Sequence, residues 1–138
     1  MDKLKILQSV NEKWDYSEPT PGAQIRVSRP SYYHHGIYIG DDKVIHFGEG
    51  NSDTDTQNPE ANTVHLSSLA DFLNGGFPEV RSYSFKEKLI LRKSSEIISE
   101  AEKMLGSGGY NLITNNCEHF SNFCAFGVKY SKSDKLGR

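Results

Sequence analysis

The stretch of sequence that decides the fold is residues 34–47, HHGIYIGDDKVIHF. Its two halves, 34–40 and 43–47, are rich in β-branched and aromatic residues and flank a Gly-Asp-Asp turn signal at 40–42. Two such runs around a tight turn predict a β-hairpin. The hairpin carries three of the five histidines of the chain, so a functional site is first sought here.

The two faces of this hairpin separate its histidines. Strand residues alternate between faces, so His34 and Tyr38 share one side while His35 shares the other with Ile37. We expect His35 to pack in the core beside the isoleucines. His34 is therefore the better candidate for a catalytic base.

Whether His46 joins His34 on one face depends on the register of the hairpin. A two-residue loop would pair Ile39 with Val44 and place the two histidines on opposite faces. A three-residue loop would place them on the same face. If both histidines belong to one site, the loop is expected to have an odd number of residues.

The candidate nucleophile is Cys117. Asn116 before it is a good helix cap, which predicts that Cys117 lies in the first turn of a helix. There the helix dipole and the free backbone N–H groups favour a thiolate and can also bind an oxyanion on a substrate carbonyl. Cys124 is expected to be a small core residue. On one helix the two sulfurs would be about 10 Å apart, too far for a disulfide.

A thiolate nucleophile needs a base, and the base is expected to come from the hairpin. His119 lies two residues further along the helix and therefore points away from Cys117. His34 is then the base, with His46 as the third residue that orients its ring. A zinc site and a purely structural role are the alternatives, but the spacing of the histidines does not match a metal-binding motif.

The remainder of the chain predicts strands and helices around the hairpin. Strands are expected at 23–28, 63–66 and 80–85, and helices at 68–73, 94–105 and from 117 to about 126. These elements predict an α+β fold, in which an antiparallel sheet carries the histidines and packs against helices.

Length and composition indicate one domain with two short flanks. The chain has 138 residues, of which residues 1–21 are expected to be a weakly structured lead-in, 22–128 the catalytic domain and 129–138 a basic tail. Residues 48–62 hold four acidic residues and no basic one, which indicates a solvated loop. Such a loop either borders a substrate cleft or is a surface insertion.

The charge and hydropathy patterns exclude several classes of protein. Sixteen basic and 18 acidic side chains give a net charge of −2, so we expect no nucleic-acid partner. No apolar run approaches the ~20 residues that span a bilayer. The opening residues, MDKLKILQSVNEKW, lack the apolar region of a signal peptide, so the expected location is the cytoplasm.

Two segments resemble the motifs of a known family. Residues 34–47 resemble the histidine box of the lecithin–retinol acyltransferase-like family, and residues 110–120, YNLITNNCEHF, resemble its cysteine box. The boxes stand in the family's order, about 70 residues apart, and the resemblance covers roughly residues 20–127. It implies a circularly permuted papain-like fold.

The resemblance also implies a thiol acyltransferase or phospholipase. Cys117 would attack an ester carbonyl of a glycerophospholipid and form an acyl-thioester, which water, an amine or an alcohol would then resolve. His34 matches the family's general base and His46 its third catalytic residue. We expect Tyr38 and Tyr110 to contact substrate. No metal or organic cofactor is implied, and the expected partner is a phospholipid acyl donor, reached through peripheral contact with a membrane.

Two rival functions use the same fold. Permuted papain-like peptidases that remove ubiquitin-like modifiers carry a similar cysteine segment, usually with Asn after the cysteine. Glu118 at that position, together with the histidine pair, favours the acyltransferase branch. The third alternative is a non-catalytic binding module that has kept both segments.

Overall fold

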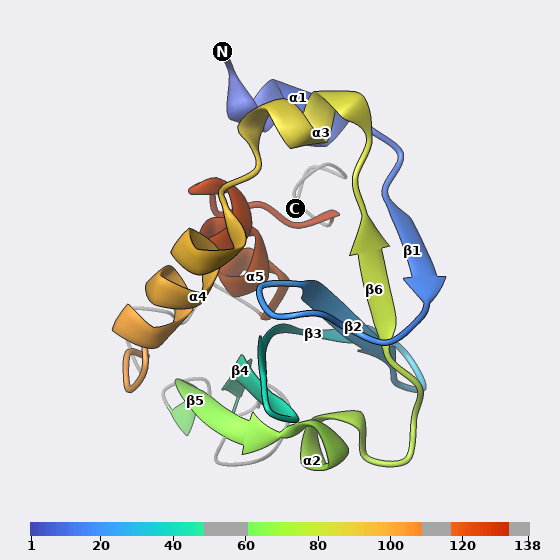
Figure 1. The fold of residues 1–138 in the computed structure, drawn as a ribbon, viewed down its shortest axis with the longest axis vertical. Helices are drawn as coiled ribbons and strands as arrows, with labels where there is room; N and C mark the ends of the chain where they lie inside the picture. Colours follow the sequence, from blue (N-terminus) through green and yellow to red (C-terminus); the bar gives the residue numbers. More distant parts are fainter. Residues whose placement is uncertain (49–60, 109–116, 133–138) are drawn as a thin grey trace.

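The computed structural model describes residues 1–48, 61–108 and 117–132, which form a six-stranded sheet and five helices (Figure 1). The strand order is β1-β6-β2-β3-β4-β5, and each neighbouring pair is antiparallel. The strands are β1 Lys13–Tyr16, β2 Gln24–Ser28, β3 Tyr33–Gly40, β4 Lys43–Gly48, β5 Thr63–Ser68 and β6 Glu79–Ser82. The predicted antiparallel α+β class is confirmed.

Helices cover both faces of this sheet. They are α1 Lys3–Ser9, α2 Leu69–Leu73, α3 Phe85–Ile90, α4 Ser94–Lys103 and α5 Cys117–Phe126. One hydrophobic cluster joins α4 and α5 to the face that carries Ile37 and Ile45, and a second cluster joins Phe72 of α2 to the face that carries Tyr38 and Val44. Figure 1 accordingly shows α4 and α5 together at mid-height, with α2 apart from them at the bottom of the view.

The hairpin of β3 and β4 places His34 and His46 on one face, but without the expected odd-numbered loop. Gly40 pairs with Lys43, so the loop has two residues, and Asp41 and Asp42 both adopt positive φ angles of 51° and 55°. Such angles are typical of the tight hairpin turn whose twist matches that of the strands. The expected odd-numbered loop is therefore wrong.

The odd residue lies in the strand instead. The register shifts between Tyr38, which pairs with Val44, and Gly40, which pairs with Lys43. Ile39 is thus the extra residue of a β-bulge, which moves the pairing by one position. Because of this shift, residues of equal parity face each other, and His34 and His46 lie on the same face.

The N-terminal segment is more ordered than the expected lead-in. Residues 3–9 form the helix α1, whose Leu7 is buried in the core, and β1 pairs with β6 at the edge of the sheet. Figure 1 shows α1 beside α3, with β1 running down alongside β6. Most of the first 16 residues therefore contribute directly to the fold.

Three sequence expectations fall outside the described residues. They are the solvated loop, apart from its ends at Gly48, Ala61 and Asn62, the tyrosine at position 110 with the Asn116 cap, and the tail from 133 onward.

Candidate active site

Cys117 is the first residue of α5 and is held against the backbone of β3. The backbone N–H of His35 donates to its Sγ at 3.4 Å, and the carbonyl oxygen of Tyr33 lies 3.9 Å from the same atom. The pairing of β3 with β4 ends at Gly36 and His46, so these two backbone groups lie just past the part of β3 that pairs with β4. An N–H group that donates to sulfur favours the thiolate over the thiol.

This position brings the thiol close to His34. The nitrogen of His35 is two covalent bonds from the Cα of His34, so Sγ lies within about 6 Å of that Cα. The Cys117 thiol lies on the face of the sheet that packs against α5. The His34 side chain lies on the opposite face, against Phe72 of α2. The site is therefore formed at the end of the β3–β4 pairing, where the two layers meet.

A polar network fixes α5 on the sheet. The side-chain amide of Gln24 in β2 donates to Ser121 Oγ at 3.0 Å and to Asn122 Oδ1 at 2.9 Å. Arg81 of β6 donates to the same Asn122 oxygen at 3.0 Å and forms a buried ion pair with Glu87 of α3. Buried polar groups that are satisfied in this way hold a packed helix in one orientation.

His34 and His46 form a buried pair. Nε2 of His34 lies 2.9 Å from Nδ1 of His46, and the two rings meet edge to face with centroids 4.9 Å apart. Phe72 packs against both rings at 5.1 and 5.2 Å. The structure thus brings together the two histidines that the sequence proposed, although their roles in catalysis stay a prediction.

His35 occupies the core position expected for it. Its ring meets Trp14 edge to face at 5.6 Å, and burial, helped by the nearby Arg26 guanidinium, lowers its pKa to about 3. A histidine with that pKa stays neutral at physiological pH. It is therefore a poor partner for a thiolate, which needs a protonated imidazole beside it.

The second cysteine is a core residue. Cys124 is fully buried among apolar side chains, and burial raises the pKa of its thiol to about 12. Both Cys117 and Cys124 are free thiols, as the helix geometry required. Cys124 therefore has the burial and the raised pKa of a packing residue, and the role of Cys117 as nucleophile stays a prediction.

The two tyrosines proposed as substrate contacts have different outcomes. Tyr38 is buried on the His34 face, and its hydroxyl accepts a hydrogen bond of 3.2 Å from the backbone N–H of Asp42. This hydrogen bond joins β3 to the turn at Asp42, so Tyr38 has a structural role in the hairpin. Its contact with substrate stays a prediction, and Tyr110 lies outside the described residues.

Sequence reasoning missed two residues of β5 that extend the histidine pair. His65 pairs with His46 across the strands, and their ring centroids are 4.2 Å apart. Ser67 lies two residues further on the same face, with Oγ 3.0 Å from Nε2 of His46. The expected strand ended at residue 66 and so excluded Ser67. His65 and Ser67 are two residues apart, so a strand extended to residue 67 would have predicted that both lie on one face.

Glu118, next to the candidate nucleophile, has a perturbed carboxyl group. Its side chain accepts a hydrogen bond of 3.3 Å from the backbone N–H of Lys132. Burial, with a contribution from the negative charge of Glu12, raises its pKa to about 7. A carboxyl with a raised pKa makes the folded state less stable as the pH rises, because ionisation is easier in the unfolded chain.

We expect Glu118→Gln to stabilise the protein above neutral pH. The two proteins should unfold with similar free energies near pH 4.5, and the difference should grow to about 3 kcal/mol in favour of the variant by pH 8. Denaturant unfolding across this pH range measures it. Glu102→Gln on the exposed side of α4 is the matched control. Equal pH profiles for Glu118→Gln and wild type would contradict the perturbed carboxyl.

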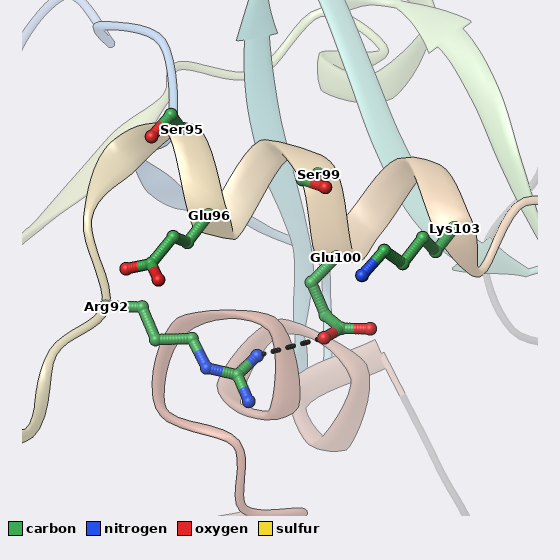
Figure 2. A pocket seen from close by; sticks show the side chains of 6 residues that line it. All are labelled: Arg92, Ser95, Glu96, Ser99, Glu100 and Lys103. Atoms are coloured by element: carbon green, nitrogen blue, oxygen red, sulfur yellow. Dashed lines mark hydrogen bonds and ion pairs between the residues drawn. The ribbon is translucent and has the colours of Figure 1, made fainter.

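The described surface includes a hollow along α4 and another beside the hairpin turn. The hollow along α4 has a volume of about 470 Å³, and in it Arg92 reaches Glu100 at 3.3 Å (Figure 2). The hollow beside the hairpin turn has a volume of about 480 Å³ and is lined by Asp41, Asp42, Lys43, Leu66, Ser67, Ser68 and Asp71. Within the described ranges no cluster of three or more candidate metal ligands occurs.

The fold and the site together define a class of protein. It is an α+β protein with a histidine pair on an antiparallel sheet and a cysteine at the start of the helix packed on that sheet. Within this class, the chain belongs to the lecithin retinol acyltransferase family, because the family's model matches residues 17–130.

Individual relatives agree with this assignment. Lecithin retinol acyltransferase of Mus musculus is 28% identical over 141 residues, covering 88% of this chain and 60% of the relative. Phospholipase A and acyltransferase 3 of Homo sapiens is 32% identical over 127 residues, covering 86% of this chain and 76% of the relative. The chain thus spans about three fifths of the length of that lecithin retinol acyltransferase. None of the helices in the described part of the chain is long and apolar enough to cross a membrane.

Proposed function

We propose that the protein is a cysteine-dependent acyltransferase or acyl hydrolase that takes an acyl chain from a glycerophospholipid. Cys117 is the nucleophile, His34 the general base and His46 the residue that orients His34. The observation that carries the proposal is the position of the Cys117 thiol, at a helix start and beside the strand that supplies the buried histidine pair. The names of the relatives, acyltransferases and phospholipases A, support the same chemistry.

The proposed reaction proceeds in two halves. His34 accepts the proton of the Cys117 thiol, and the thiolate attacks the ester carbonyl to give a tetrahedral oxyanion. When the oxyanion collapses, the ester C–O bond breaks, the leaving alcohol takes the proton from His34, and an acyl-thioester remains on Cys117. Water, an alcohol or an amine then attacks the thioester with His34 again as base, and the thiol is restored.

Nε2 of His34 is engaged by His46, so Nδ1 is the nitrogen that exchanges the proton with sulfur in this scheme. The backbone N–H groups at the start of α5 are suited to the oxyanion, since a helix N-terminus favours negative charge. The expected cytoplasmic location, with peripheral contact to the membrane that carries the substrate, is part of the proposal.

Intact-protein mass spectrometry after incubation with a short-chain phosphatidylcholine tests the proposal. We expect wild type to gain the mass of one acyl group, which hydroxylamine removes, and Cys117→Ala to gain none. Cys124→Ala, the matched control, should still be acylated. If neither an acyl-enzyme nor released fatty acid is detected, the lipid ester is wrong, and amide and isopeptide substrates become the next candidates.

A further inference from the structure

The hydroxyl of Ser67 forms a hydrogen bond with His46 on the side of the ring away from His34. Ser67 is a largely buried residue of β5, and its Oγ lies 3.0 Å from Nε2 of His46. The same hydroxyl donates to the carbonyl oxygen of Ser68 at 3.1 Å. Ser67, His46 and His34 therefore form a continuous chain of hydrogen bonds across three neighbouring strands.

The direction of each hydrogen bond in this chain follows from the first one. A serine hydroxyl has one proton, and the carbonyl of Ser68 can only accept, so Ser67 donates to it. The Ser67 oxygen must then accept from His46, which places a proton on Nε2 of His46. A neutral imidazole carries one N–H, so Nδ1 of His46 holds a lone pair and accepts from Nε2–H of His34. The lone pair of His34 is thereby placed on Nδ1.

We propose that Ser67 is a positioning residue that sets the tautomers of both histidines. It does not touch the reacting atoms; it acts through His46 on His34. The inference rests on the proposed function in one respect, namely that Nδ1 of His34 is the nitrogen that serves Cys117.

Without the Ser67 hydroxyl, the hydrogen bonds between His46 and His34 no longer have a fixed direction. Without Ser67, His46 can carry its proton on Nδ1 and donate it to Nε2 of His34, which forces the proton of His34 onto Nδ1. That arrangement leaves no lone pair for the thiol. Ser67 lines the surface hollow beside the hairpin turn, so water can replace its hydroxyl in a truncated variant. Water can donate as well as accept, and therefore does not fix the direction.

Nitrogen NMR of the imidazole rings tests the proposal directly. In resting wild-type protein at neutral pH, without substrate, long-range proton–nitrogen correlations should show Nε2–H tautomers for both His34 and His46. Ser67→Ala should show a mixture of tautomers. Ser67→Thr keeps a hydroxyl and should restore the wild-type pattern.

Ser68→Ala is the matched control in the same experiment. Its side chain caps α2 by accepting from the backbone N–H of Asp71, and its carbonyl is unchanged by the substitution. The tautomers should therefore stay as in wild type. If Ser67→Ala does not fold, Ser67→Cys replaces it, because a thiol is a poor acceptor. A Ser67 variant without the hydroxyl that keeps the wild-type tautomers would overturn the proposal.

Kinetics separate this inference from the proposed function. Where wild type transfers acyl groups, Ser67→Ala should lower kcat by roughly 10- to 100-fold with little change in KM, and Ser67→Thr should recover most of it. An unchanged kcat in Ser67→Ala would also overturn the proposal. If wild type has no acyl-transfer activity but the tautomers respond to Ser67→Ala, the proposed function fails while the assignment of Ser67 stands.

Discussion

Cys117→Ala is expected to reduce acyl transfer to the uncatalysed background, a loss on the order of 10⁴-fold or more in kcat. The reason is that the covalent intermediate forms on the Cys117 sulfur in the proposed reaction, and the other thiol, Cys124, is fully buried in the core. The free energy of unfolding should change by less than about 1 kcal/mol, since the substitution removes one sulfur atom from the start of a helix.

Cys124→Ala should show the opposite pattern. Its sulfur is fully buried in the cluster that joins α5 to the sheet, so its removal should cost about 1 kcal/mol of stability and leave kcat near the wild-type value. Assays of acyl transfer and denaturant unfolding on both variants complete the comparison. The reverse pattern, in which Cys117→Ala stays active and a folded Cys124→Ala is inactive, would exclude Cys117 as the nucleophile.

The second large effect is expected at His34. His34→Ala should lower kcat by roughly 10²- to 10⁴-fold, the usual contribution of a general base, while KM changes little. The adjacent His35 provides the control: His35→Phe keeps a ring against Trp14 and leaves the backbone N–H that binds Cys117 unchanged. It should therefore retain most of the activity. Equal losses in the two variants would mean that the wrong histidine has been assigned.

Wild type and His35→Phe should also differ in how their stability responds to pH. Because burial lowers the pKa of His35 to about 3, protonation of its ring is easier in the unfolded chain. Wild type should therefore lose stability as the pH falls below about 6.5, and His35→Phe should lose less over that range. This comparison requires only unfolding curves and is independent of the acyl donor.

Many of the elements, together with the candidate nucleophile Cys117 and the candidate base His34, could be predicted from local sequence. The hairpin, the helix that begins at Cys117 and the separation of His34 from His35 all follow from short periodic patterns. The exact pairing of β3 with β4 could not be predicted, because the bulge at Ile39 depends on which residues the rest of the sheet buries. The correct face for His46 was thus reached with the wrong loop.

Two other differences have separate causes, one local and one long-range. The expected strand at 80–85 ends at Ser82, because Ser84 and Glu87 form a capping box that starts α3. The N-terminal segment is polar and short, so its part in the fold depends on long-range contacts of Leu7 and β1. No local sequence pattern predicts contacts of this kind.

The bulge at Ile39 also restricts which insertions and deletions the β3–β4 hairpin can tolerate. Deletion of Ile39 would remove the bulge and keep the two-residue turn, so Tyr38 would still pair with Val44 and Gly36 with His46, and His46 would keep its face. With a two-residue turn, paired residues are separated by an even number of positions when the bulge is present and by an odd number when it is absent. Insertions and deletions that survive at this tip should therefore come in even numbers, or occur together with the gain or loss of the bulge.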